Sequence, residues 1–89
     1  MTISSEIKAA IESNMELMIN QTRAYAPFLK VAFPSVRDLS DLTFNMMVGN
    51  ASTVFITQFT MRMQSPSESD FAEFGKLVEI YRNKVKELF

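Results

Sequence analysis

Apolar or small side chains recur every three or four residues along the N-terminal part of the chain. They form one stripe at Ile7, Ile11, Met15, Met18, Thr22, Tyr25, Leu29 and Ala32. This spacing predicts an amphipathic helix over residues 4–33. Ser4 or Ser5 can cap its start, because a serine oxygen accepts a hydrogen bond from a free amide of the first turn. Pro27 lacks a backbone donor and clashes with the preceding turn, so we expect a kink near residues 23–26 or two helices that meet there.

The C-terminal segment has the most regular pattern. Its apolar positions are spaced by steps of three and four at Phe71, Phe74, Val78, Tyr81, Val85 and Leu88. Such a/d spacing predicts a helix with a single apolar stripe over residues 65–89. Ser65, Pro66 and Glu68 match the N-cap, N1 and N3 positions of a capping box, so we expect this helix to begin at Ser65.

The central segment, residues 35–64, is apolar on two sides if it is drawn as a helix. One side carries Leu42, Met46, Val54 and Met61, and the other carries Phe44, Val48, Phe55 and Phe59. Such a helix must be covered on both sides. Ser35 and Asp38 resemble a capping box at its start. Residues 42–61 hold no charge and are long enough for a bilayer, but their many Thr, Asn and Gln side chains favour a buried helix over a transmembrane one.

A β-hairpin is the alternative for this central segment. Residues 43–48 and 53–63 are rich in β-branched and aromatic side chains, and Gly49-Asn50 between them could form the turn. Met46, Met47 and Val48 break the alternation that a strand requires, so the helix is favoured. The pattern therefore predicts an all-α fold, a short three-helix bundle with its first helix kinked at Pro27. The alternative is an αββα protein.

The amino-acid composition adds a surplus of apolar surface to this picture. The chain has 89 residues, enough for one domain over residues 1–89, and 47% of them are hydrophobic, with eight Phe and seven Met. A domain of this size has a small core, so part of the apolar surface is expected to be covered by a second molecule. Twofold pairing is the commonest arrangement. We predict a homodimer whose contact includes Phe28, Val31, Phe33, Phe44, Val48, Phe55 and Phe59.

The charged and reactive residues narrow the possible functions. Nine basic and ten acidic residues leave a net charge of −1, which lacks the basic excess typical of nucleic-acid binding. The chain has neither His nor Cys, so the commonest general base and thiolate chemistry are absent. Glu12 and Glu16 are four residues apart but have no second acidic pair to complete a metal site, and no catalytic constellation stands out. We expect no enzyme activity, no cofactor and no bound metal.

The predicted function is that of a non-enzymatic helical module. Such a module self-associates or binds a partner protein through its apolar helix faces. The alternative is a protein that binds apolar material, namely a lipid, a granule surface or a small hydrophobic ligand. No signal peptide or transmembrane segment is evident, so the expected location is the cytoplasm.

Overall fold

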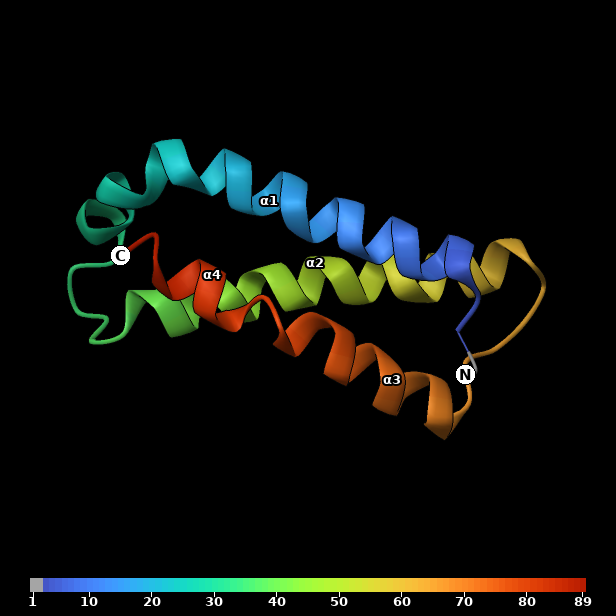
Figure 1. Ribbon diagram of the computed structural model, residues 1–89. Coiled ribbons are helices and arrows are strands. Elements are labelled where there is room, and N and C mark those ends of the chain that lie inside the picture. Colours follow the sequence, from blue (N-terminus) through green and yellow to red (C-terminus); the bar gives the residue numbers. More distant parts are fainter. Residues whose placement is uncertain (1–2) are drawn as a thin grey trace.

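The protein is an all-α bundle in which three helical segments pack along one another. The computed structural model describes residues 3–89, and these contain helices α1 (Ser5–Ala32), α2 (Leu39–Met61), α3 (Glu68–Glu79) and α4 (Arg82–Lys86), with no strand among them. α1 and α2 are antiparallel, and α3 with α4 runs back beside them as the third, broken segment (Figure 1). The prediction of an all-α fold is confirmed, and the hairpin alternative at Gly49-Asn50 is wrong.

Helix α1 begins as predicted and continues through Pro27. The N-cap is Ser4, whose Oγ accepts a hydrogen bond of 3.3 Å from the Ile7 amide. The segment stays one helix to Ala32, but its last turns bend away from the axis of the rest (Figure 1). A bend here has a direct cause, because the proline ring crowds the carbonyl of Arg23 and provides no amide to bond it. The sequence correctly located the disturbance, and the outcome is a bend rather than two helices.

Helix α2 starts later than the sequence predicts. Its N-cap is Asp38, whose Oδ1 accepts hydrogen bonds from the Asp41 amide and the Ser40 hydroxyl, and Ser35 lies in the preceding turn. The prediction of a cap at Ser35 is therefore wrong. An aspartate caps a helix as well as a serine does, and Pro34 holds Ser35 in a turn with the end of α1.

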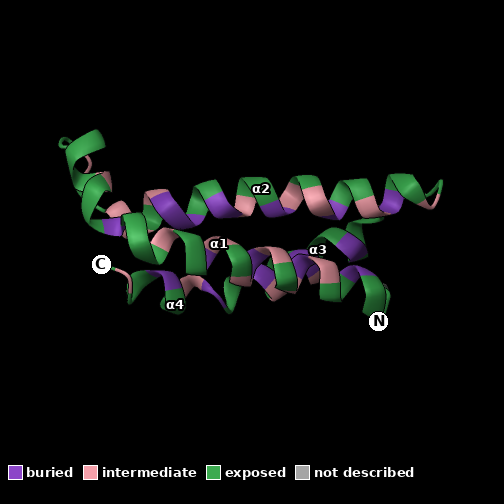
Figure 2. Ribbon diagram, turned by 90° about the horizontal axis from the view of Figure 1, so that it is seen from above, coloured by how far each residue is buried: buried purple, intermediate pink, exposed green. Residues whose placement is uncertain are grey.

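Only one side of α2 is fully covered, in contrast to the two-sided cover expected. The phenylalanine side is buried, whereas Met46 and Met61 on the opposite side are exposed, and Leu42 and Val54 are half-buried. Figure 2 shows that the residues of α2 that face the other helices are buried and those that face away are largely exposed. The surplus of apolar side chains in the sequence therefore remains on the surface of the single chain.

The end of α2 is closed by a Schellman motif. The Met63 amide donates to the Thr60 carbonyl, and the Gln64 amide donates to the Phe59 carbonyl, both at 2.9 Å. This motif needs a left-handed residue at its corner, and Met63 adopts it with φ of 56°. Glycine usually occupies this position because a side chain makes the conformation costly.

The third segment has the predicted apolar stripe, but it is broken and starts two residues late. Ser67 is the N-cap, and it forms a reciprocal capping box with Asp70, so the prediction that Ser65 begins the helix is wrong. The chain leaves the helix after Glu79 and resumes it at Arg82. The stripe still faces the core, because four of its six predicted members are buried: Phe74, Val78, Tyr81 and Val85.

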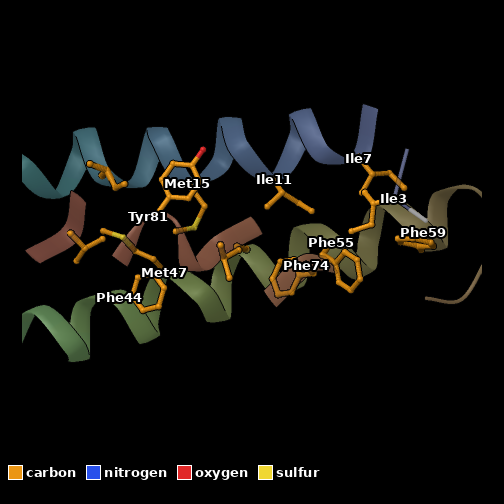
Figure 3. Packing of buried hydrophobic residues seen from close by; sticks show 14 residues of the cluster. Ile3, Ile7, Ile11, Met15, Phe44, Met47, Phe55, Phe59, Phe74 and Tyr81 are labelled. Carbon is orange, nitrogen blue, oxygen red and sulfur yellow. The ribbon is translucent and has the colours of Figure 1, made fainter. Parts of the chain in front are cut away.

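The core is a continuous row of side chains between the three segments (Figure 3). Within this row Phe55 is fully buried and stacks on Phe74, with 4.6 Å between the ring centroids. Met15 and Ile11 of α1 belong to the same cluster, as does Tyr81 (Figure 3). Near the other end of α2, the Arg82 guanidinium lies over the Phe44 ring at 4.4 Å from its centroid. This packing explains why the first half of α1 is well covered.

Candidate interaction surface

A group of exposed large apolar side chains lies at the last turns of α1. We call residues 25–33 the α1 end. Phe28 is 65% exposed and Val31 is 78% exposed, and Tyr25 and Phe33 are exposed as well. In Figure 2 the outer part of this segment is almost entirely in the colour of exposed residues. Four large apolar side chains exposed over nine residues form a patch of the kind that marks an interaction site.

Three of the seven residues predicted at a dimer contact lie on this patch. Phe28, Val31 and Phe33 are exposed at the α1 end, and Val48 is half-buried. The remaining three, Phe44, Phe55 and Phe59, are buried in the core of their own chain, so their side chains are not on the surface. The sequence pattern could not separate the two groups, because both consist of aromatic residues at helical spacing.

A groove lies between the second half of α1 and the first half of α2. We call it the α1–α2 groove. It has a volume of about 490 Å³ and is lined by nine residues: Met18, Gln21, Thr22, Tyr25, Leu29, Thr43, Met46, Met47 and Asn50. The sequence analysis placed several of these residues on apolar stripes but predicted that they would be covered. They line an open groove because α3 and α4 cover a different part of α1 and α2.

Two polar groups in the groove differ in how they are bonded. The Asn50 Oδ1 accepts a hydrogen bond of 3.0 Å from the Asn14 Nδ2, so this pair connects α2 to α1. The Thr43 hydroxyl, in contrast, is buried and has no hydrogen-bond partner. Asn45 and Gln58 bond only within α2 or its cap, to Asp41 and Arg62 respectively.

Two acidic residues of α1, Glu6 and Glu16, form ion pairs with Arg62 and Lys84 respectively. Glu16 forms an ion pair of 3.0 Å with Lys84, which fastens α4 to α1. Burial, followed by the nearby carboxylates of Glu16 and Glu12, raises the pKa of the Tyr81 phenol above its usual value of 10.0. Within residues 3–89 no group of three or more acidic side chains is close enough to hold a metal ion.

The charged residues within residues 17–37 are all basic, and the acidic Asp38 lines the same hollow as Lys30 and Arg37. Between Glu16 and Asp38 the sequence has three charged residues, Arg23, Lys30 and Arg37, and all of them are basic. All three are exposed. A surface that combines exposed aromatic residues with basic ones suits a partner that is apolar, acidic or both.

Among the described helices, none is both long and apolar enough to cross a membrane. Comparison of the chain with models of protein families, with curated proteins and with solved structures finds no match.

Proposed function

We propose that the chain is a non-enzymatic interaction module that forms a homodimer through the α1 end. The observation that carries this proposal is the exposure of Tyr25, Phe28 and Val31 in the last turns of α1 and of Phe33 at its C-cap. Burying apolar surface is worth about 25 cal/mol per Å², so a patch of large side chains is a strong source of binding energy. A second copy offers the same patch, and a twofold axis brings the two patches together.

The shape of the bundle supports this use of the α1 end. The first half of α1 is covered by α2 and by the third segment, whereas the bent last turns extend beyond the row of core residues (Figures 1 and 3). Ala26 is the only residue of this end that is buried. The α1 end thus contributes little to the core of its own chain, and its apolar side chains are available to a partner.

Sedimentation equilibrium with charge-introducing variants tests the proposal. We expect the wild type to have twice the chain mass of 10.2 kDa at micromolar concentration. Phe28→Glu and Val31→Glu should each give the single-chain mass with an unchanged helical circular dichroism spectrum, because both positions are exposed in the single chain. Met61→Glu is the matched control, because Met61 is also exposed but lies at the far end of α2.

A wild type that sediments as a monomer would contradict the self-association proposal. So would a dimer that Met61→Glu dissociates and Phe28→Glu leaves intact, because the contact would then lie at the opposite end of the bundle.

A second candidate function is binding of apolar material, such as a lipid or granule surface. The observation in its favour is the exclusively basic charge of residues 17–37 around the exposed aromatic side chains. Basic residues add attraction to anionic lipid headgroups while aromatic residues enter the interface. A monomeric wild type that co-sediments with vesicles containing phosphatidylserine, and does so less at high salt, would favour this candidate over the dimer.

A further inference from the structure

The α1–α2 groove has the dimensions of a ligand site. Its volume of about 490 Å³ falls within the range of roughly 300–1,000 Å³ that is usual for small-molecule pockets. The lining residues extend from Met18 to Leu29 on α1 and from Thr43 to Asn50 on α2. At about 1.5 Å per residue these stretches are about 16 Å and about 10 Å long. An elongated groove of this kind suits a linear chain better than a compact ring system.

The lining of the groove selects an uncharged occupant. None of its nine residues is acidic or basic, and three of them are methionines: Met18, Met46 and Met47. An ionised group placed there would lose its hydration without gaining an opposite charge, which is costly. Methionine side chains are flexible and polarisable, so they adapt readily to an aliphatic chain.

The Thr43 hydroxyl provides a polar anchor within this apolar lining. Three hydroxyl side chains of α2 donate to the carbonyl four residues earlier: Ser52 at 2.8 Å, Thr53 at 3.4 Å and Thr60 at 3.0 Å. Thr43 is only 5% exposed, and its hydroxyl makes no such bond. A buried hydroxyl without a partner costs free energy, which a ligand group would recover. Threonine has two accessible χ1 rotamers in a helix, so the hydroxyl can turn toward a ligand in the groove.

We propose that the α1–α2 groove binds an uncharged, linear aliphatic molecule that carries one hydroxyl or carbonyl group. The aliphatic chain lies against the methionines and Leu29, and the polar group forms a hydrogen bond with the Thr43 hydroxyl. The groove shares Tyr25 and Leu29 with the α1 end, but the two side chains that carry the proposed dimer contact, Phe28 and Val31, do not line it.

Titration of the full chain with decanol, followed by NMR of ¹³C-methyl-labelled methionines, tests the site. The methyl signals of Met18, Met46 and Met47 should shift together and saturate. Those of Met61 and Met63 should stay unchanged, because both are exposed outside the groove. Equal shifts at all five methionines would show non-specific association and would overturn the proposal. Decanoate should bind more weakly than decanol, since its carboxylate is ionised at pH 7. If decanoate binds as tightly as decanol or more tightly, the assignment of an uncharged ligand to the groove is wrong.

Thr43→Val tests the anchor without changing the shape of the side chain. The variant should fold with equal or greater stability, because it removes a buried hydroxyl that has no partner. Its affinity for decanol should fall by about three- to tenfold, the usual effect of losing one hydrogen bond. An unchanged affinity would refute the role of Thr43.

Three variants locate the bound ligand and distinguish this proposal from self-association. Met46→Glu puts a charge into the groove at an exposed position and should abolish decanol binding, whereas Met61→Glu should not. Phe28→Glu should halve the mass of the dimer and leave decanol binding intact. If Phe28→Glu instead abolishes both, the groove is part of the dimer contact and the separate ligand site is refuted.

Discussion

Replacement of Phe55 by alanine is the perturbation that most severely tests the core. Phe55 has no exposed surface and contacts three other rings: Phe74 in a stacked arrangement, and Phe59 and Phe71 edge-on at 5.3 and 5.2 Å. Truncation of a buried phenylalanine to alanine typically costs about 3–5 kcal/mol of unfolding free energy. At about 0.05–0.15 kcal/mol per residue, the 89 residues correspond to a total of about 4–13 kcal/mol. Phe55→Ala should therefore remove about a quarter or more of the stability.

Urea unfolding followed by circular dichroism, at one fixed protein concentration, measures this loss. Phe55→Leu keeps most of the volume and should cost about 1–2 kcal/mol, so it gives a measurable value even if the alanine variant does not fold. Thr57→Ala is the control, because Thr57 is exposed on the same helix and its loss should change stability by about 0.5 kcal/mol or less. Equal effects of Phe55→Ala and Thr57→Ala would refute the placement of the core.

Three further substitutions probe local features of the fold. Met63→Gly should raise the unfolding free energy in urea by about 1 kcal/mol, because glycine adopts the left-handed backbone of this position without strain and the Met63 side chain is 95% exposed. An unfolding free energy below that of the wild type would refute backbone strain at Met63. Gly75→Ala should add about 0.5–1 kcal/mol of stability and raise the thermal midpoint, since a Cβ at this position meets open space. A lower thermal midpoint would contradict this open space. The raised pKa of Tyr81, due first to burial, means that the unfolded chain loses its phenolic proton first as pH rises. Stability should therefore decrease above about pH 10, and Tyr81→Phe should reduce that decrease in a pH series of urea curves.

The sequence was sufficient to predict the helices that bury a single stripe. The spacing of Ile7, Ile11 and Met15 in α1, and of Phe74 and Val78 in α3, follows directly from the geometry of a helix that lies on a core. The N-cap residues were harder to predict from the sequence. Several Ser and Asp residues precede α2 and α3, and the side chain of each can accept a hydrogen bond from a first-turn amide. The choice of Asp38 and Ser67 depends on where the preceding turn ends.

The candidate sites depend on which parts of each helix are covered by the other helices. The periodicity of apolar residues in the sequence does not give this information. Tyr25 continues the stripe of Ile11 and Met15, yet it is exposed because the third segment does not cover the α1 end. Phe44 and Phe28 are both aromatic residues in helices, but only the packing of α1 and α4 on α2 distinguishes the buried one from the exposed one. The groove and the unbonded Thr43 hydroxyl follow from the same incomplete cover.

An isotope-filtered nuclear Overhauser experiment tests the proposed dimer contact most directly. Equal amounts of ¹³C-labelled and unlabelled chain are mixed, and contacts between copies are recorded. The proposal predicts cross-peaks from the Val31 methyl groups of the labelled chain to aromatic protons of Phe28 in the unlabelled chain. It also predicts no cross-peak between copies for the Val85 methyl groups, which are fully buried within their own chain. Absence of cross-peaks at Val31, or their appearance only at residues outside the α1 end, would contradict the account.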